Sequence, residues 1–335
     1  MAKKISDEKL KSWLGELASA GKLYGPDAKK MRWGKVDFVE NLGNAFEIKT
    51  SPKEVFLPQD QTMFKYDLTD PAGTFAEIVP HPPEGAVLWG LRPCDAKALM
   101  LIHRVYNEGS YKDVYFNSLW EGMIKIAVGC TNPLSTCFCT SFEGGNPFGT
   151  DGVDVLATKI DGQWILEPVT ERGEKLIADF DDATDADNET LKRVKQAAIE
   201  KVDSTVPTVI AEKLWEKFGD EDFWFDLGAT CLGCGICTFV CPSCYCFDIN
   251  EEQIDRRVRR YRTWDSCQFA LFTLEASGHN PRPTQLQRIR QRMMHKLSFF
   301  AKRYDGTQLC VGCGRCISAC PTSIDIRDVA RTAMA

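Results

Sequence analysis

Residues 231–242 read CLGCGICTFVCP, and residues 310–321 read CVGCGRCISACP. The two stretches align without gaps, and both follow the pattern C-x2-C-x2-C-x3-C-P. Three cysteines at intervals of three residues can place their thiolates on three irons of one cubane. The glycines between them let the backbone approach the cluster and offer N–H donors to its sulfides. The repeat therefore predicts a carboxyl-terminal region built around iron–sulfur clusters.

This spacing is that of bacterial two-cluster ferredoxins, in which the fourth cysteine of each run binds the other cluster. We therefore predict two [4Fe–4S] clusters with crossed ligands. The first cluster is assigned to Cys231, Cys234, Cys237 and Cys320. The second cluster is assigned to Cys310, Cys313, Cys316 and Cys241.

Two features leave alternatives open. Structural zinc sites also use C-x2-C pairs, although zinc takes four ligands and each run here offers three evenly spaced cysteines plus a Cys-Pro. The 68 residues between Cys241 and Cys310 are more than a minimal two-cluster ferredoxin needs. Which of Cys241 and Cys320 closes which cluster therefore stays open.

The composition of the 335-residue chain is that of a globular protein, with 44% hydrophobic and 26% charged residues. The formal net charge of −6 argues against a dedicated nucleic-acid binder. No apolar run approaches the 18 residues of a membrane span, and the first residues lack the apolar core of a signal peptide. We therefore expect a cytoplasmic protein without a membrane segment, in which dense cysteines hold metal rather than disulfides.

The cysteines divide the chain, because 11 of the 15 lie in residues 227–335. We predict an α/β domain over residues 1–226 and a ferredoxin-like two-cluster domain over residues 227–335, which carries an insertion at 247–305. In the first domain, apolar periodicity predicts helices at 7–20, 95–106 and 209–218 and strands at 86–91 and 124–128. Residues 153–168 resemble a hairpin with its turn at Asp161-Gly162. The acidic stretch 181–190 is interpreted as a solvated loop.

Four further cysteines form a candidate site in the first domain. Cys94 follows a predicted strand in GLRPCD, and three more thiols follow in GCTNPLSTCFC, namely Cys130, Cys137 and Cys139. Ligand sites of α/β sheets form at such strand ends, so the hypothesis is a third iron–sulfur cluster. The alternative is that Cys94 is a small buried hydrophobe and that the other three have no ligand. Cys244, Cys246 and Cys267 are interpreted as core packing beside the clusters.

The insertion is predicted to be helical and basic. Residues 251–305 hold 12 Lys and Arg against 6 Asp and Glu. A helix over 286–300 would place Leu286, Ile289, Met293, Leu297 and Phe300 on one face. Basic residues such as Arg292 and Lys296 could then stabilise an anionic cluster and raise its potential, or could be solvated surface charge. Nucleic-acid binding by RRVRRYRTW is a third and weaker interpretation.

No self-sufficient catalytic centre is visible in the sequence. It lacks a G-x-G-x-x-G motif, a P-loop and a C-x-x-C-H haem motif, and none of its four histidines is paired at metal-ligand spacing. We therefore expect no catalytic residue and no flavin in this chain itself.

Several segments resemble one known family. WGLRPCDAKAL, GCTNPLSTCFCTSFEGGNP, CPSCYCFD, RTWDSCQF and RQRMMHKLSFF are similar to the iron–sulfur beta subunit of cytoplasmic sulfhydrogenases and to the A subunit of anaerobic sulfite reductase. SPKEVFLPQDQTMFKY near the amino terminus is similar to the same family, so the resemblance spans most of the chain. At 276–280 the chain has ASGHN where the family has Gly-Gly-His-Asn.

The resemblance implies an electron-transfer subunit of an anaerobic multi-subunit oxidoreductase. Its expected partners are a flavin- and NAD(P)-binding reductase subunit and a catalytic subunit of hydrogenase, sulfite reductase or heterodisulfide-reductase-like type. Two other functions stay open. One is a self-contained iron–sulfur flavin reductase, and the other is a redox-sensing iron–sulfur protein.

Overall fold

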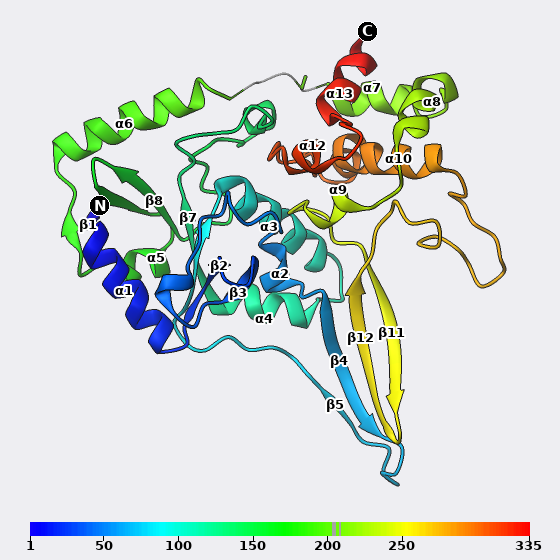
Figure 1. Ribbon diagram of the computed structural model, residues 1–335, viewed down its shortest axis with the longest axis horizontal. Helices are drawn as coiled ribbons and strands as arrows, with labels where there is room; N and C mark the ends of the chain where they lie inside the picture. The colour runs from blue at the N-terminus through cyan, green and yellow to red at the C-terminus, as the bar shows by residue number, and fades with distance from the viewer. Residues whose placement is uncertain (203–205, 208) are drawn as a thin grey trace.

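A computed structural model describes residues 1–202, 206–207 and 209–335. Figure 1 shows three parts: a mixed α/β body, a narrow arm of strands that projects from it, and a helical region that includes the carboxyl terminus. The α/β class predicted for the first part of the chain is confirmed.

The body is organised around one eight-stranded sheet. Its strand order is β10-β1-β9-β8-β7-β6-β2-β3. The strands are β1 (Lys3–Ser6), β2 (Leu23–Asp27), β3 (Arg32–Lys35), β6 (Ala86–Leu91), β7 (Met123–Val128), β8 (Val155–Ile160), β9 (Gln163–Pro168) and β10 (Asp181–Asp182). The four central strands β2, β6, β7 and β8 are parallel, and the outer strands are antiparallel. The predicted strands at 86–91 and 124–128 are thus the buried centre of the sheet.

Both faces of this sheet are covered, as a parallel sheet requires. Leu88 of β6 packs in a core with residues of α3 and α4, whereas its neighbours Val87 and Trp89 pack on the other face with residues of α1. The helices of the body are α1 (Asp7–Ser19), α2 (Lys53–Phe56), α3 (Pro93–Tyr106), α4 (Val114–Gly122), α5 (Glu171–Leu176) and α6 (Asp185–Ile199), with short 3₁₀ turns η1 (Val39–Asn41) and η2 (Cys139–Ser141).

At two places the structure forms a cap or a turn that the local sequence indicates. Ser6 caps α1, because its hydroxyl accepts a hydrogen bond from the Lys9 N–H at 3.3 Å. The hairpin β8–β9 turns at Asp161 and Gly162, whose φ angles of 42° and 81° are those of a type I′ turn.

The acidic stretch 181–190 is not the solvated loop that was expected. Its first two residues form β10, and α6 begins at Asp185. The Thr184 hydroxyl accepts from the Asp187 N–H, while the Asp187 carboxylate accepts from the Thr184 N–H at 2.8 Å, which is a capping box. Polar residues and acidic charge are therefore the start signal of this helix.

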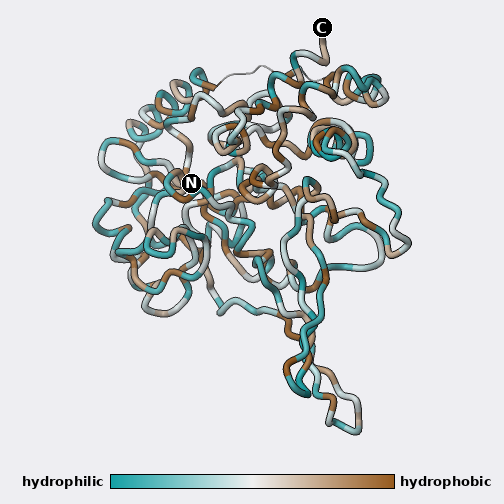
Figure 2. The backbone as a smooth tube through the Cα atoms, turned by 45° about the vertical axis from the view of Figure 1, so that its right-hand side comes forward, coloured by the Kyte–Doolittle hydropathy of each residue, from teal (hydrophilic) through white to brown (hydrophobic). Residues whose placement is uncertain are grey.

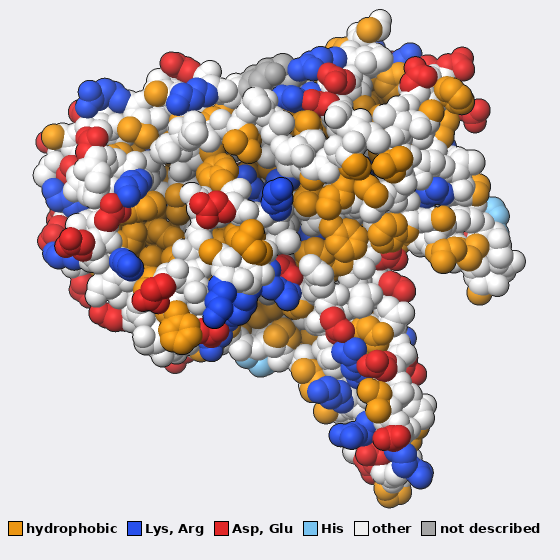
Figure 3. All heavy atoms as spheres, viewed as in Figure 1, with side chains coloured by type: hydrophobic (Ala, Val, Ile, Leu, Met, Phe, Trp, Pro, Cys, Tyr) orange, Lys and Arg blue, Asp and Glu red, His pale blue; other side chains and the backbone are white. Residues whose placement is uncertain are grey.

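The arm is a four-stranded antiparallel sheet built from two distant segments (Figures 1 and 2). Its order is β11-β12-β4-β5, from β4 (Asp60–Asp67), β5 (Phe75–Glu77), β11 (Phe247–Ile254) and β12 (Arg257–Trp264). Blue and red side chains mix along it in Figure 3, and Arg259 pairs with Asp60 at 2.9 Å and with Glu252 at 2.6 Å. The first part of the insertion is therefore a hairpin rather than a helix.

The helical region contains α7 (Ile210–Glu216), α8 (Glu221–Thr230), α9 (Ile236–Phe239), α10 (Gln285–Met294), the π-helical segment η3 (His295–Phe299), α11 (Phe300–Arg303), α12 (Arg315–Ala319) and α13 (Ile326–Met334). The predicted apolar face of 286–300 lies in the core here, since Ile289, Met293 and Leu297 are buried. Within the described residues, every helix is too short or too polar to serve as a membrane span.

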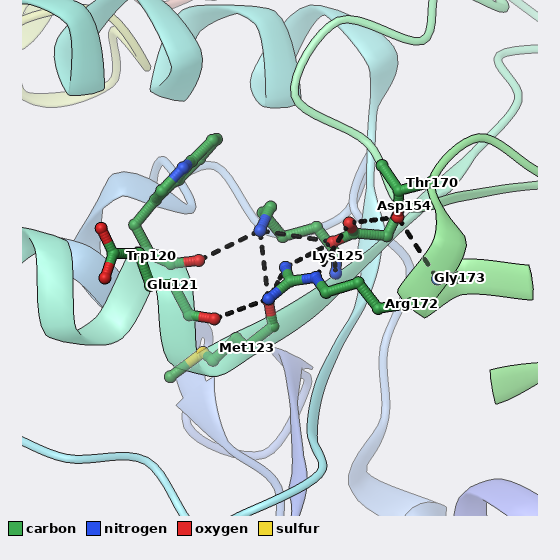
Figure 4. A network of polar contacts seen from close by, with 8 residues as sticks. All are labelled: Trp120, Glu121, Met123, Lys125, Asp154, Thr170, Arg172 and Gly173. Atoms are coloured by element: carbon green, nitrogen blue, oxygen red, sulfur yellow. Dashed lines mark hydrogen bonds and ion pairs between the residues drawn. The ribbon is translucent and has the colours of Figure 1, made fainter. Parts of the chain in front are cut away.

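A polar network around the buried carboxylate of Asp154 connects β7, β8 and α5 (Figure 4). The Asp154 carboxylate lies 2.9 Å from the Arg172 guanidinium and 3.3 Å from the Lys125 ammonium, and it accepts from the Lys125 N–H at 2.8 Å. The Thr170 hydroxyl also donates to it at 2.8 Å. Burial opposes the charged form, but these donors hold the pKa of Asp154 at about 2.

Candidate iron–sulfur centres

The first predicted set of thiols surrounds a cavity in the helical region. Its empty volume is about 480 Å³, and all four cysteines line it, namely Cys231, Cys234, Cys237 and Cys320. The apolar side chains of Ile289, Met293, Ile324 and Ile326 form much of the remaining wall. Burial raises the pKa of Cys237 to about 11, so binding of a metal centre must displace a proton from this thiol. Cys234 is the exposed member of the set.

The second predicted set surrounds a neighbouring cavity. Its empty volume is about 330 Å³, and it too is lined by all four cysteines, namely Cys241, Cys310, Cys313 and Cys316. Cys316 and Arg292 line both cavities, so the two sets are directly adjacent. The structure thus brings the fourth cysteine of each run to the first three of the other. That these thiols bind iron stays a prediction.

The local backbone explains how each run curls around its cavity. Gly235 and Gly314 precede α9 and α12 with φ angles of 75° and 70°, which favour glycine. A Cβ atom on Gly314 would lie 2.4 Å from the carbonyl oxygen of Thr136. The second run is therefore packed tightly against the Cys130–Cys139 loop of the body.

Three buried cations face the thiols. The exposed fractions of Lys53, Arg292 and Lys296 are 3%, 3% and 2%. Within the described residues none of the three forms an ion pair with a carboxylate. Burial alone would lower the pKa of Lys296, yet the thiols of Cys241 and Cys244 raise it overall. A four-thiolate cubane is an anion, so the donor set and these cations fit such a group together.

A fourth cation pairs with an acid beside the second set. Asp95 is fully buried and receives both guanidinium arms of Arg315, with NH2 at 2.9 Å, and the Nε of Arg92 at 3.3 Å. Burial would raise the pKa of Asp95, but the two arginines hold it below its usual value. Arg315 lies between two proposed ligands in the chain, so this network joins the body to the second centre.

The candidate third set is only partly brought together. Cys130, Cys137 and Cys139 lie close enough together for their charges to interact. Burial raises the pKa of Cys130 to about 11 and that of Cys139 to about 12. Cys94 instead packs in a separate cluster with Phe300, Leu309 and Cys313. Its thiol has Asp95, Arg92 and Cys313 as its strongest charged neighbours.

The third set nevertheless lies against the second. The Phe138 N–H donates to the Gly312 carbonyl at 2.8 Å, and the Cys137 thiol lies 3.9 Å from the Cys313 carbonyl oxygen. Among the described residues, no three His, Cys, Asp or Glu side chains are arranged to chelate one metal ion.

Sequence reasoning missed Lys53 and the Asp95–Arg315 pair. The Lys53 ammonium donates to the Cys244 carbonyl across 191 residues of sequence, so no spacing signal connects them. Asp95 adjoins Cys94, and Arg315 lies inside the second run. A charged residue next to a proposed ligand is the signal that could have indicated the pair.

Comparisons with known proteins agree with the cysteine repeat of the sequence. Residues 230–324 match the 4Fe-4S dicluster domain family. The carboxyl-terminal region of this chain is therefore a 4Fe-4S dicluster domain, as the repeat predicted.

Over 343 residues the chain is 26% identical to sulfhydrogenase 2 subunit beta of Pyrococcus furiosus, an alignment that covers 96% of this chain and 95% of that protein. The chain is a homologue of that beta subunit, which confirms the resemblance seen in its motifs. No solved structure matches the chain.

Proposed function

We propose that this chain is the electron-transfer subunit of a cytoplasmic, anaerobic oxidoreductase complex. It would relay single electrons between a flavin- and NAD(P)-binding subunit and a catalytic subunit of hydrogenase, sulfite reductase or heterodisulfide-reductase-like type. The observation that carries the proposal is the pair of adjacent cavities, each of which is lined by all four thiols of one predicted set, with Cys316 and Arg292 lining both. The similarity to a sulfhydrogenase subunit supports the same function.

When bound, [4Fe–4S] clusters supply one-electron carriers at low potential. The residues of this chain hold and tune them. Cys231, Cys234, Cys237 and Cys320 would ligate one cluster, and Cys241, Cys310, Cys313 and Cys316 the other. Arg292, Lys296 and Arg315 would offset the negative charge that each reduction adds, and so raise the potential of the neighbouring centre.

The Cys130, Cys137 and Cys139 loop would extend this path into the body. We propose a third cluster there, with Cys94 as its fourth ligand after a local rearrangement. The support is the contact of this loop with Gly312 and Cys313 in the second run. Because Cys234 is exposed, the first centre would be the end of the relay that meets a partner subunit.

Iron and sulfide analysis of anaerobically purified protein, combined with EPR, tests the proposal. We expect about eight irons per chain for two clusters and about twelve for three. Replacing Cys137 by Ala should remove one EPR species and about four irons while the dicluster signals persist. Unchanged iron in that variant would contradict the third cluster alone.

The relay itself is tested by its partners. An affinity-tagged chain purified from anaerobic extract should carry a flavoprotein with it and contain no flavin of its own. Stoichiometric flavin in the isolated chain would instead indicate a self-contained reductase. Salt-dependent binding to DNA or RNA would indicate a redox sensor, and we expect none.

A further inference from the structure

Two glutamine side chains meet at the sulfur of Cys231, which belongs to the first predicted set of thiols. The Gln285 side-chain amide donates to this sulfur at 3.2 Å, and the Cys231 thiol donates to the Gln268 side-chain oxygen at 3.5 Å. Gln268 also lines the cavity of the first set and is only 2% exposed. A buried amide that faces a proposed ligand is a candidate for controlling how that ligand behaves.

The two glutamines come from different segments of the chain. Gln268 follows β12, whereas Gln285 is the first residue of α10. In Figure 1 the chain between these two elements leaves as a long loop and returns to the helical region. The Gln285 amide joins the two ends of this loop, because it also donates to the Gln268 side-chain oxygen at 3.2 Å.

Arg288 fixes the orientation of both side chains. Its guanidinium donates to the Gln285 side-chain oxygen at 2.8 Å, and its carbonyl accepts from the Gln268 side-chain amide at 2.9 Å. The Gln268 backbone N–H donates in addition to the buried Ser266 hydroxyl at 3.1 Å. A Gln285 amide turned by 180° would lose its bonds to Cys231, Gln268 and Arg288 together. Its N–H groups are therefore held towards the sulfur.

The second set has different neighbours. Arg292 lines both cavities, but Lys296 lines only the second of them. The Ser243 hydroxyl lies 3.6 Å from the Cys241 sulfur. Hydrogen bonds to the sulfurs and nearby positive charge both favour the reduced, more negative form of a cluster. The Cys231 sulfur therefore has a source of stabilisation, a side-chain amide, that is separate from the charge at the second cavity.

We propose that Gln285 raises the reduction potential of the first centre by donating to the Cys231 thiolate, and that Gln268 is a positioning residue that orients it. The inference rests on the proposed function, because it requires a cluster at the first set. On binding, an S–Fe bond replaces the S–H bond of Cys231, and the proton leaves to solvent. The sulfur can then only accept, so Gln285 remains as its side-chain donor. A hydrogen bond to a charged acceptor is stronger than one to a neutral thiol.

The test is Gln285→Leu in the full chain, purified without oxygen. Leucine is similar in size but cannot donate, so the iron content should stay unchanged. The midpoint potential of one EPR species should shift to a more negative value. Cys234→Ser alters a ligand of the first set alone and identifies which species belongs to it. An unchanged or more positive potential of that species in Gln285→Leu would overturn the proposal.

A second variant tests the positioning residue. Gln268→Leu removes the acceptor that orients Gln285, so it should shift the same species in the same direction. The double variant Gln268→Leu/Gln285→Leu should shift it no further than Gln285→Leu alone, whereas additive shifts would overturn the positioning role. Gln291→Leu makes the same change further along α10 and is the matched control that should shift no potential.

These outcomes are separable from those of the proposed relay. A chain that holds its clusters and its partners but shows no shift in Gln285→Leu would refute this inference alone. A chain that brings no flavoprotein from extract, yet shows the shift, would refute the relay and still support the role of Gln285.

Discussion

At the scale of single residues, buried charges that face thiols characterise this protein. Asp95 carries two buried arginine contacts, whereas Lys53, Arg292 and Lys296 have no carboxylate within the described residues. Buried ions persist only where an opposite charge repays the loss of water. The buried cations without a carboxylate partner therefore indicate where an anionic cofactor would bind.

The Asp95–Arg315 pair yields a prediction about stability. Asp95→Asn should destabilise the cluster-loaded protein by about 3–5 kcal/mol, because it leaves the Arg315 guanidinium buried beside Cys313 without a carboxylate. Denaturant unfolding followed by circular dichroism measures the change. The double variant Asp95→Asn/Arg315→Met should recover part of the loss, and strictly additive effects would contradict the assignment of the pair.

The network of Figure 4 yields a prediction about pH. The pKa of Asp154 is about 2 in the folded chain, against 3.8 as its ordinary value. This carboxylate therefore contributes about 2 kcal/mol of stability above pH 4, which is lost as the pH falls from about 4 towards 2. The difference in melting temperature between the wild type and Asp154→Asn should narrow over that range. A difference that stays constant down to pH 3 would show that the Asp154 charge is not responsible.

At the scale of elements, much of the fold could be predicted where the sequence carries a local signal. Ser6 and Gly21 delimit α1, Asp161-Gly162 turns a hairpin, and the gapless cysteine runs predicted the dicluster domain. The polar stretch 181–190 was misinterpreted, because acidic residues serve both loops and helix starts. The arm was missed because β12 pairs with β4, and a pairing across some 200 residues leaves no local pattern.

The contact between the second run and the Cys137–Cys139 loop yields an element-scale prediction. A Cβ on Gly312 would lie 2.5 Å from backbone atoms of Phe138 and Cys139, at a φ of +63°. Gly312→Ala should push the two loops apart, lower the melting temperature and reduce the iron content.

Gly73→Ala is the matched control for this substitution. Its φ of +62° imposes the same backbone strain, but no atom lies within 4 Å of the added methyl group. It should cost about 1 kcal/mol and leave the iron content unchanged. Equal effects of the two variants would mean that the loop contact does not matter for cluster binding.

At the scale of the whole molecule, residues on the two sides of the predicted boundary at residue 226 contact each other at several places. Lys53 of α2 donates to the Cys244 carbonyl, and Asp95 of α3 accepts from Arg315. The Phe138 N–H of the body donates to the Gly312 carbonyl, and β12 pairs with β4 in the sheet of the arm. These contacts involve residues far apart in sequence. The residue spacing within the runs therefore predicted which cysteines line each cavity, but not what surrounds the two cavities.

This interleaving predicts that residues 227–335 do not form a complete unit alone. Without residues 1–226, β12 has an unpaired edge where β4 lies, and apolar surface such as Phe300 and Leu309 loses Ala98 and Leu101 as partners. The isolated fragment, expressed anaerobically, should aggregate. It should also bind less iron than two clusters contain, which is about eight irons per chain. Co-expression of residues 1–226 as a separate chain should restore iron content and solubility, because it returns these contacts without a covalent link. A soluble fragment with full iron content would show that the thiol quartets assemble independently of the body, and that the contacts to α2, α3 and β4 serve electron transfer or partner binding instead.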